Sequence, residues 1–368
     1  MRIAHAMPFG ATMLNDGGAL FRLWAPAQAR IDLVLKHPYG DEVIESLALE
    51  GGWREVRLDK VDAGQRYQWR VHPPAGRRTW KGDPPCARPR FAQQSRWRAP
   101  AQRADRSAPA SNGTEGWTGR PWHEAVCYEL HVGAFTPEGT FEAAMLKLPQ
   151  LAELGITCVQ LMPLSSFVGR FGWGYDGVLH YAPHAAYGRP DALKAFIQAA
   201  HRLGMMVMLD VVYNHFGPDG NYLSLYAPGF FTQRHHTPWG AGINFDGADA
   251  VPVREFFIHN ALYWLTEYQF DGLRFDAVHA IQDDAQPDIM AELSRRVRAH
   301  CQGRQVHLVL ENDFNDARRL DTPGTARPLR CPVERRFPPC PACAADRVKT
   351  RATTPNTHAS PWPCWRDR

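Results

Sequence analysis

The alternation of hydrophobic and polar positions changes character once along this chain, near residue 125. Before that point, short segments with a hydrophobic side chain at every second position are separated by turn residues, which is the pattern of half-buried β-strands. Such strands form a small β-sandwich, so we predict an N-terminal β-sandwich domain over residues 1–85. Its predicted strands are 19–24, 31–35, 53–58 and 66–71.

From residue 125 onward, nearly continuous hydrophobic segments alternate with amphipathic ones. This alternation predicts an α/β fold, with a parallel sheet covered by helices on both faces. Because polar residues gather just after each strand, a (β/α)8 TIM barrel is favoured over a doubly wound sheet. The predicted strands are 125–132, 157–164, 205–213, 271–278 and 306–311, and the predicted helices are 141–154, 191–203, 253–268 and 288–300.

The barrel pattern stops after residue 320, with five strands assigned, whereas a closed barrel of this type has eight. Residues 327–368 contain eight prolines and four cysteines and have almost no hydrophobic periodicity, so they supply no further strand–helix units. We therefore predict a linker over 86–121, an incomplete barrel over 122–320 and an aberrant tail over 321–368.

Composition narrows the class of protein. The 368 residues are 44% hydrophobic and 22% charged, as in soluble globular proteins. A net charge of +4 without a run of Lys and Arg argues against nucleic acid or an anionic membrane as a partner. Neither a signal peptide nor a stretch of ~20 apolar residues is present, so we expect a cytoplasmic protein. The 12 Trp, 11 Tyr and 18 Phe suit a sugar substrate, although most are expected in the core.

The cysteines offer one alternative chemistry. Four of the eight, Cys331, Cys340, Cys343 and Cys364, lie in the tail and include a Cys-x-x-Cys pair that zinc could bind. That spacing is common by chance, and neither a second pair nor a set of histidines follows it. We predict reduced thiols, no metal and no cofactor.

Two acids at the ends of separate predicted strands form the strongest signal for chemistry. Asp276 follows a strand that also carries Arg274 on the same face, and Glu311 follows the next strand. Arg274 is expected to keep Asp276 ionised and to lower its pKa, as a nucleophile requires, while Glu311 would act as general acid. A retaining glycosidase places two such carboxyl groups roughly 5 Å apart. The alternative is a structural ion pair between Arg274 and Asp276.

Further polar residues follow the other strands. Asp210 could fix an arginine, and His215, at the end of the same motif, could donate to a sugar hydroxyl; a polar strand end that caps a loop is equally compatible. Tyr175, in a glycine-rich loop, could stack on a pyranose ring or pack within the loop. His279 is a candidate because it follows Asp276 closely.

These residues resemble the α-amylase superfamily of glycoside hydrolases and, within it, the maltooligosyltrehalose trehalohydrolases. The resemblance implies a sandwich-plus-barrel fold and hydrolysis, with retention, of the α-1,4 bond beside the terminal trehalose of maltooligosyltrehalose, without metal or organic cofactor. It implies Asp276 as nucleophile, Glu311 as acid/base, and Arg274, His215 and Tyr175 as ligands of the cleaved ring. The matching segments are FRLWAP (21–26), YELHVG (128–133), FTPEGTF (135–141), DVVYNHFGPDGNYL (210–223) and LEND (310–313).

The chain departs from this family in one respect. The family has a third carboxylate, in a His-Asp pair after the seventh barrel strand, and the sequence offers no such strand or pair. Five barrel strands would also leave an open sheet edge, which invites aggregation. We therefore expect the 368-residue product to be poorly soluble and to release no trehalose. A non-catalytic, carbohydrate-binding remnant and a glycogen branching or debranching enzyme remain as alternative functions.

We hypothesise that the tail is read in the wrong frame. Codons can be chosen for 329–340 so that a one-base shift reads YDAQWNDDFHH, which resembles the next segment of the family. Residues 95–107 can similarly be shifted to read AGGVHRRSVLID. The alternative for both is a disordered linker rich in Pro, Arg and Ala.

Overall fold

The computed structural model describes residue 5 and residues 8–14, 16–61, 65–72, 91–92 and 116–313. Most of the predicted linker and the tail from residue 314 lie outside the described residues. The hypothesis of a shifted reading frame and the zinc alternative at Cys331, Cys340, Cys343 and Cys364 therefore concern residues that the structure does not describe.

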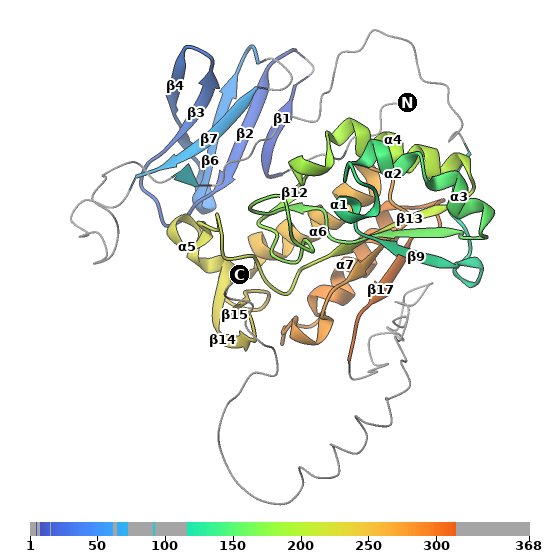
Figure 1. Ribbon diagram of the computed structural model, residues 1–368. Helices are drawn as coiled ribbons and strands as arrows, with labels where there is room; N and C mark the ends of the chain where they lie inside the picture. The colour runs from blue at the N-terminus through green and yellow to red at the C-terminus, as the bar shows by residue number, and fades with distance from the viewer. Residues whose placement is uncertain are drawn as a thin grey trace, which may run out of the picture. The chain divides into compact units, whose positions relative to one another are not determined.

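The N-terminal domain consists of two antiparallel sheets, in the orders β1-β2-β6-β5 and β4-β3-β7-β8 (Figure 1). In β2, Ala19, Phe21 and Trp24 are almost completely shielded from solvent, and the first five residues of β3 are all buried. The predicted strands β2, β6 and β7 have the predicted bounds, and β3 is two residues longer than predicted. The strands are β1 (Gly10–Met13), β2 (Ala19–Trp24), β3 (Ile31–His37), β4 (Gly40–Glu45), β5 (Leu47–Ala48), β6 (Trp53–Leu58), β7 (Arg66–Val71) and β8 (Phe91–Ala92).

The second part of the described chain is built on a parallel sheet in the order β17-β16-β13-β10-β9. Each strand of this sheet pairs with the next strand of the sheet along the chain, so the order runs in one direction from β9 to β17. In a doubly wound sheet the strand order reverses. This arrangement confirms the prediction of five consecutive strands of a barrel-type fold. The strands are β9 (Cys127–Leu130), β10 (Cys158–Leu161), β13 (Met206–Val211), β16 (Gly272–Phe275) and β17 (His307–Leu310).

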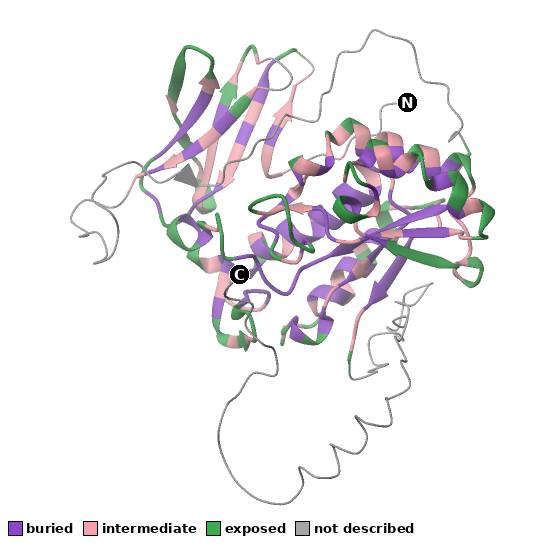
Figure 2. Cartoon of the chain, viewed as in Figure 1, coloured by how far each residue is buried: buried purple, intermediate pink, exposed green. Residues whose placement is uncertain are grey.

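Helices follow the parallel strands and pack on the sheet, whose inner strands are buried, as Figure 2 shows for β13. In α4, the hydrophobic residues Leu193, Phe196, Ile197 and Ala200 recur at helical spacing and are all buried. Among the described residues, no helix is both long and apolar enough to cross a membrane. The α-helices are α1 (Val132–Phe135), α2 (Phe141–Met145), α3 (Leu148–Glu153), α4 (Pro190–Arg202), α5 (Leu223–Tyr226), α6 (Ala250–Glu267) and α7 (Ile289–His300).

The single helix predicted over 141–154 is wrong, because the structure has two short helices, α2 and α3, in its place. Pro149 lies in the first turn of α3, where its missing N–H has no intrahelical partner to lose. A continuous helix would bring the proline ring against the carbonyl group of Met145. Proline therefore favours a new helix start at this point.

The sequence patterns also missed two small antiparallel pairs of strands. One pair is β11 (Ser165–Ser166) with β12 (Leu179–Pro183), and the other is the hairpin of β14 (Phe231–Thr237) and β15 (Gly240–Ile243). The hairpin lies in the connection between β13 and α6, where no element was predicted. Pro238 and Gly240 at its tip are the turn signal that could have identified it.

Candidate active site

The candidate residues lie where the parallel strands end. Asp210 and Arg274 are directly paired in the register of β13 and β16, and Asp276 and Glu311 each follow the last residue of their strand. The backbone continues this alignment, because the N–H of Glu311 donates to the carbonyl of Phe275 at 3.0 Å. Parallel strands bring their carboxyl ends to one edge, which is the edge that carries active sites in barrel enzymes.

Arg274 binds all three acids at this edge. Its Nη1 lies 2.7 Å from Oδ2 of Asp210 and 2.9 Å from Oδ1 of Asp276, and its Nη2 lies 2.9 Å from Oε1 of Glu311. The side chains of Asp210 and Asp276 are 0% and 13% exposed, whereas that of Glu311 is 38% exposed. A single guanidinium therefore joins one deeply buried acid, one largely buried acid and one that solvent reaches.

The pKa of Asp276 is higher than the sequence predicts. Burial raises the pKa of Asp276 to about 6, and the charge of Glu311 and a hydrogen bond with it add to the rise; Arg274 opposes the rise without cancelling it. Burial likewise raises the pKa of Asp210 to about 7 against the effect of Arg274. Arg274 therefore lowers the pKa of Asp276, as predicted, but burial and Glu311 outweigh it, so the expectation of a pKa below the usual value of an aspartate is wrong.

Ala277, the residue after Asp276, fixes the position of Glu311. Its backbone N–H donates to Oε2 of Glu311 at 2.8 Å, and the N–H of Val278 donates to the Glu311 carbonyl at 3.0 Å. Ala277 has φ 43°, in the left-handed region that residues other than glycine rarely adopt. The turn after β16 thus aligns two donors with the end of β17.

Tyr175 is joined to the same group of acids, since its hydroxyl donates to Oδ2 of Asp210 at 2.8 Å. A close backbone contact holds its loop in place: a Cβ atom on Gly217 would lie 1.9 Å from the carbonyl oxygen of Asp176. The structure therefore gives Tyr175 a polar contact with Asp210. Its predicted stacking on a pyranose ring is not tested by this contact.

His215 lies beside the Tyr175 loop and under an aromatic ring. Burial lowers the pKa of His215, although the charge of Asp176 and a hydrogen bond with the Tyr175 backbone oppose this. The ring of Trp239, at the tip of the β14–β15 hairpin, stacks on His215 with centroids 4.9 Å apart and planes 12° apart. Trp239 is 50% exposed, so one part of its ring is open to a ligand. Sequence analysis did not single out Trp239.

His279 occupies a different position from the other candidates. It lies in the short 3₁₀ helix η5 (Val278–Ala280) and is exposed, with Nε2 3.9 Å from Oδ2 of Asp313. The contacts described above join Tyr175, Asp210, Arg274, Asp276 and Glu311 into one cluster, with His215 next to it. His279 follows the cluster in the chain, and its ion pair is with Asp313.

Several buried polar atoms at this edge have no hydrogen-bond partner within the part of the chain that the structure describes. They are Oδ1 of Asp210, Nδ1 of His215 and both side-chain polar atoms of Asn214. Buried polar groups are rarely left unpaired in native proteins. A ligand rich in hydroxyl groups could supply the missing donors and acceptors.

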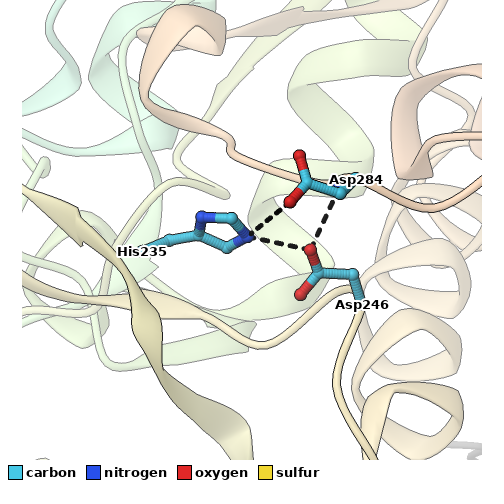
Figure 3. A group of neighbouring side chains, drawn as sticks. All are labelled: His235, Asp246 and Asp284. Carbon is cyan, nitrogen blue, oxygen red and sulfur yellow. Dashed lines mark hydrogen bonds and ion pairs between the residues drawn. The ribbon is translucent and has the colours of Figure 1, made fainter.

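One group of side chains among the described residues has the composition of a metal site. His235, Asp246 and Asp284 offer ligand atoms that all lie within 4.8 Å of one another (Figure 3). Arg234, however, binds both of these carboxylates, with Nη1 3.4 Å from Oδ2 of Asp246 and Nη2 2.9 Å from Oδ2 of Asp284. Because a guanidinium already binds both carboxylates, this group is better suited to ion pairing than to a cation.

Comparison with known proteins agrees with this fold. The family described as carbohydrate-binding module 48 (isoamylase N-terminal domain) matches residues 8–85, and the alpha amylase catalytic domain matches residues 102–227. A crystal structure of a putative α-amylase from Salmonella typhimurium is similar, with a TM-score of 0.74 and 40% sequence identity, over 88% of this chain and 53% of that chain.

Among its relatives are two malto-oligosyltrehalose trehalohydrolases. That of Deinococcus radiodurans is 51% identical over 210 residues, which are 55% of this chain and 34% of that protein. That of Mycobacterium tuberculosis is 40% identical over 308 residues, which are 82% of this chain and 50% of that protein. The matches thus span between a third and a half of the relatives' length. With its N-terminal β-domain and barrel-type sheet, the chain belongs to the α-amylase family of glycoside hydrolases and is a homologue of the malto-oligosyltrehalose trehalohydrolases.

Proposed function

We propose that this site hydrolyses, with retention, the α-1,4-glucosidic bond beside the terminal trehalose unit of maltooligosyltrehalose and so releases trehalose. The observation that carries the proposal is the pair Asp276 and Glu311, at the ends of adjacent strands and bound to the same guanidinium. The identity to trehalohydrolases supports the choice of substrate. Contacts with the two nitrogens Nη1 and Nη2 of one guanidinium keep the two acids near each other, and a retaining enzyme holds its carboxyl groups roughly 5 Å apart.

In the proposed reaction, a carboxylate oxygen of Asp276 attacks the anomeric carbon while the bond to the leaving oxygen breaks. Glu311 donates its proton to that oxygen, and the leaving sugar departs. Glu311 then takes a proton from water, whose oxygen attacks the anomeric carbon and frees Asp276. The partial exposure of Glu311 and the burial of Asp276 suit these roles, since the acid/base must exchange protons with water.

The neighbouring residues would bind the sugar. Asp210 and His215 each have a buried polar atom available to a hydroxyl group, and Arg274 would keep the acids in position. The exposed part of the Trp239 ring would stack on a glucose unit, and Tyr175 and His279 would complete the contacts. No metal ion has a role in this proposal.

We propose further that the third carboxylate of the family comes from a segment that a corrected reading frame would supply. The described sheet has five strands, and its outermost strands β9 and β17 each pair with a single neighbour in this sheet. With residues 1–85 and strand β8 as the β-domain and 122–320 as part of the barrel, the 368-residue chain would then bind maltooligosaccharides without releasing trehalose.

The test combines an assay with a binding measurement. The 368-residue protein is incubated with maltooligosyltrehalose, and trehalose is quantified, while its affinity for maltotetraose is measured by calorimetry. The same assay follows for the protein made from a gene whose bases have been redetermined over residues 93–117 and from residue 318 onward. Trehalose released by the second protein supports the proposal. New α-1,6 links, or no glucan binding by either protein, would overturn it.

A further inference from the structure

The β14–β15 hairpin, which carries Trp239, has an interrupted ladder. Thr232 pairs with Gly242 and His236 pairs with the next residue, Ala241, so residues 233–235 of β14 have no counterpart on β15. Bulges of this kind redirect side chains away from the ladder. Here the redirected side chains include Arg234 and His235, the two that reach the acids drawn in Figure 3.

The acids come from two other segments. Asp246 follows β15, and its Oδ2 accepts hydrogen bonds from Nε2 of His235 at 2.8 Å and from the N–H of Asp284 at 3.0 Å. Asp284 follows η5 in the connection after β16, and its Oδ2 lies 2.9 Å from Nη2 of Arg234. Figure 3 shows the three side chains of His235, Asp246 and Asp284 converging from separate segments. The cluster thus replaces, at the bulge, the ladder contacts that the hairpin lacks.

The burial of the side chains indicates which of these contacts contributes most to stability. The side chain of Asp246 is 3% exposed and that of His235 is 13% exposed, whereas that of Asp284 is 66% exposed. An exposed ion pair contributes little to stability, but removing one partner of a buried pair leaves a charge without compensation. His235 and Asp246 therefore form the main contact, and the exposed Arg234–Asp284 pair adds to it.

The acids themselves are held by the helix behind them. Nη1 of Arg254, in α6, lies 2.7 Å from Oδ2 of Asp283 and donates to the carbonyl of Phe245 at 2.9 Å. These two residues directly precede Asp284 and Asp246 in the chain. The hairpin therefore contacts segments that α6 holds in place through Arg254.

We propose that Arg234, His235, Asp246 and Asp284 form a clamp that holds the β14–β15 hairpin against the connection after β16 and thereby keeps Trp239 stacked on His215. The four are positioning residues, since they act on the glucan through Trp239. This inference rests on the proposed function in one respect only, which is that the exposed part of the Trp239 ring contacts the glucan.

The test compares variants of the 368-residue protein by hydrogen–deuterium exchange and by affinity for maltotetraose. In His235→Ala, exchange over 231–243 should accelerate about tenfold and the Kd should rise several-fold; Asp284→Asn, at the exposed end, should show a smaller change in the same direction. Trp239→Ala should raise the Kd without accelerating exchange, and adding His235→Ala to it should raise the Kd no further.

The N-terminal domain offers a matched control. Nε2 of His72 lies 2.7 Å from Oδ2 of Asp32, which is 2% exposed and also binds an arginine, Arg30, at 3.1 Å. His72→Ala should leave both the exchange over 231–243 and the Kd unchanged. Equal changes in this variant would mean a general loss of stability and would overturn the clamp.

The remaining outcomes separate the clamp from the proposed function. Unchanged exchange over 231–243 in His235→Ala overturns the clamp, whatever the affinity. If His235→Ala accelerates exchange but Trp239→Ala leaves the Kd unchanged, Trp239 does not contact the glucan. The proposed function then loses this contact, and the clamp has no role in binding. If EDTA accelerates the exchange of the unaltered protein, the cluster is a metal site and the ion-pair clamp is overturned.

Discussion

Ala277 donates its backbone N–H to Oε2 of Glu311 at 2.8 Å, so the residue after one candidate catalytic acid binds the other acid. Its φ of 43° is a conformation that costs a residue with a Cβ about 1–2 kcal/mol. Strain of this kind persists where the surroundings enforce it, often at functional sites. We interpret the strained turn as the device that sets the position of Glu311 relative to Asp276.

Substitutions at Ala277 test this interpretation. The free energy of unfolding of Ala277→Gly should lie within about 1 kcal/mol of that of the unaltered protein, because glycine adopts a positive φ readily. Ala277→Val should lower the free energy of unfolding by about 1–3 kcal/mol, measured by urea denaturation. Gln269, with φ 64°, is a matched position elsewhere in the chain, and there too the Gly variant should be more stable than the Val variant. Equal stability of the Gly and Val variants at 277 would contradict the strain.

The raised pKa of Asp276 predicts a pH-dependent gain in stability on its removal. Since burial raises the pKa to about 6 from 3.8, the folded state holds this proton more tightly than the unfolded state. The unfavourable contribution of the ionised group therefore appears as the pH rises from about 4 to about 6 and persists above that range. Asp276→Asn should have the same Tm as the unaltered protein near pH 4 and a higher Tm at pH 8.

Glu255 provides a control of opposite sign. A hydrogen bond with His259 is the main cause that lowers the pKa of Glu255 to about 2, and Arg296 contributes. Ionised Glu255 stabilises the fold above the unfolded-state pKa of 4.5, and this contribution is lost as the pH falls toward 2. Glu255→Gln should therefore lower the Tm at pH 8. A lower Tm for both variants at pH 8 would show that the Asp276 assignment is wrong.

The same pKa predicts the acid limit of activity. Asp276 attacks only as a carboxylate, so turnover by an active form of the protein should fall tenfold per pH unit below about pH 6. The pH dependence of kcat/KM measures this limit, because it reports the pKa values of the free enzyme. A kcat/KM that stays constant down to pH 4 would exclude Asp276 as the nucleophile.

Arg274 should be the residue whose loss disturbs the site most. Arg274→Gln leaves Asp210, Asp276 and Glu311 without their shared cation, and breaking a buried pair of this kind costs about 3–5 kcal/mol. The pKa of Asp276 should rise above its value of about 6, because the opposing charge is gone. Carbon-13 NMR of the carboxyl groups measures the pKa, and urea denaturation measures the stability. A lower pKa for Asp276 in the variant would contradict the ion-pair geometry.

Tyr175 should act on Asp210 through its hydroxyl group. Tyr175→Phe removes a hydrogen bond that lowers the pKa of Asp210, so this pKa should rise above about 7. The affinity for maltotetraose should fall several-fold, in keeping with about 1 kcal/mol for one hydrogen bond. Tyr181→Phe, which removes a hydrogen bond to the carbonyl of Phe256, is the control and should leave that affinity unchanged.

Hydrophobic periodicity predicted much of the fold, because a strand with one buried face or a fully buried parallel strand leaves a clear pattern. The strands β2, β6 and β7 were predicted residue for residue, and the five strands of the parallel sheet were placed in order. The convergence of Asp276 and Glu311 followed from one rule, that the ends of parallel strands meet at one edge. The split between α2 and α3 was missed because Pro149 was not read as a helix start.

The rest of the site depends on distances between residues remote in sequence. The sign of the pKa shift of Asp276 is set by burial and by Glu311, neither of which the Arg274–Asp276 spacing reveals. Trp239 became a candidate only when the hairpin placed its ring on His215. Residue types near strand ends therefore identified most of the acids and partners, while their electrostatics and the aromatic contact required the structure.

The most direct test of the proposed function is trehalose release by the protein made from the gene with redetermined bases, beside its Asp276→Asn variant and the 368-residue chain. We predict that the first releases trehalose from maltooligosyltrehalose with retention and that neither of the other two does. Release by the Asp276→Asn variant at the rate of its parent, or by none of the three proteins, would contradict the assignment of this site.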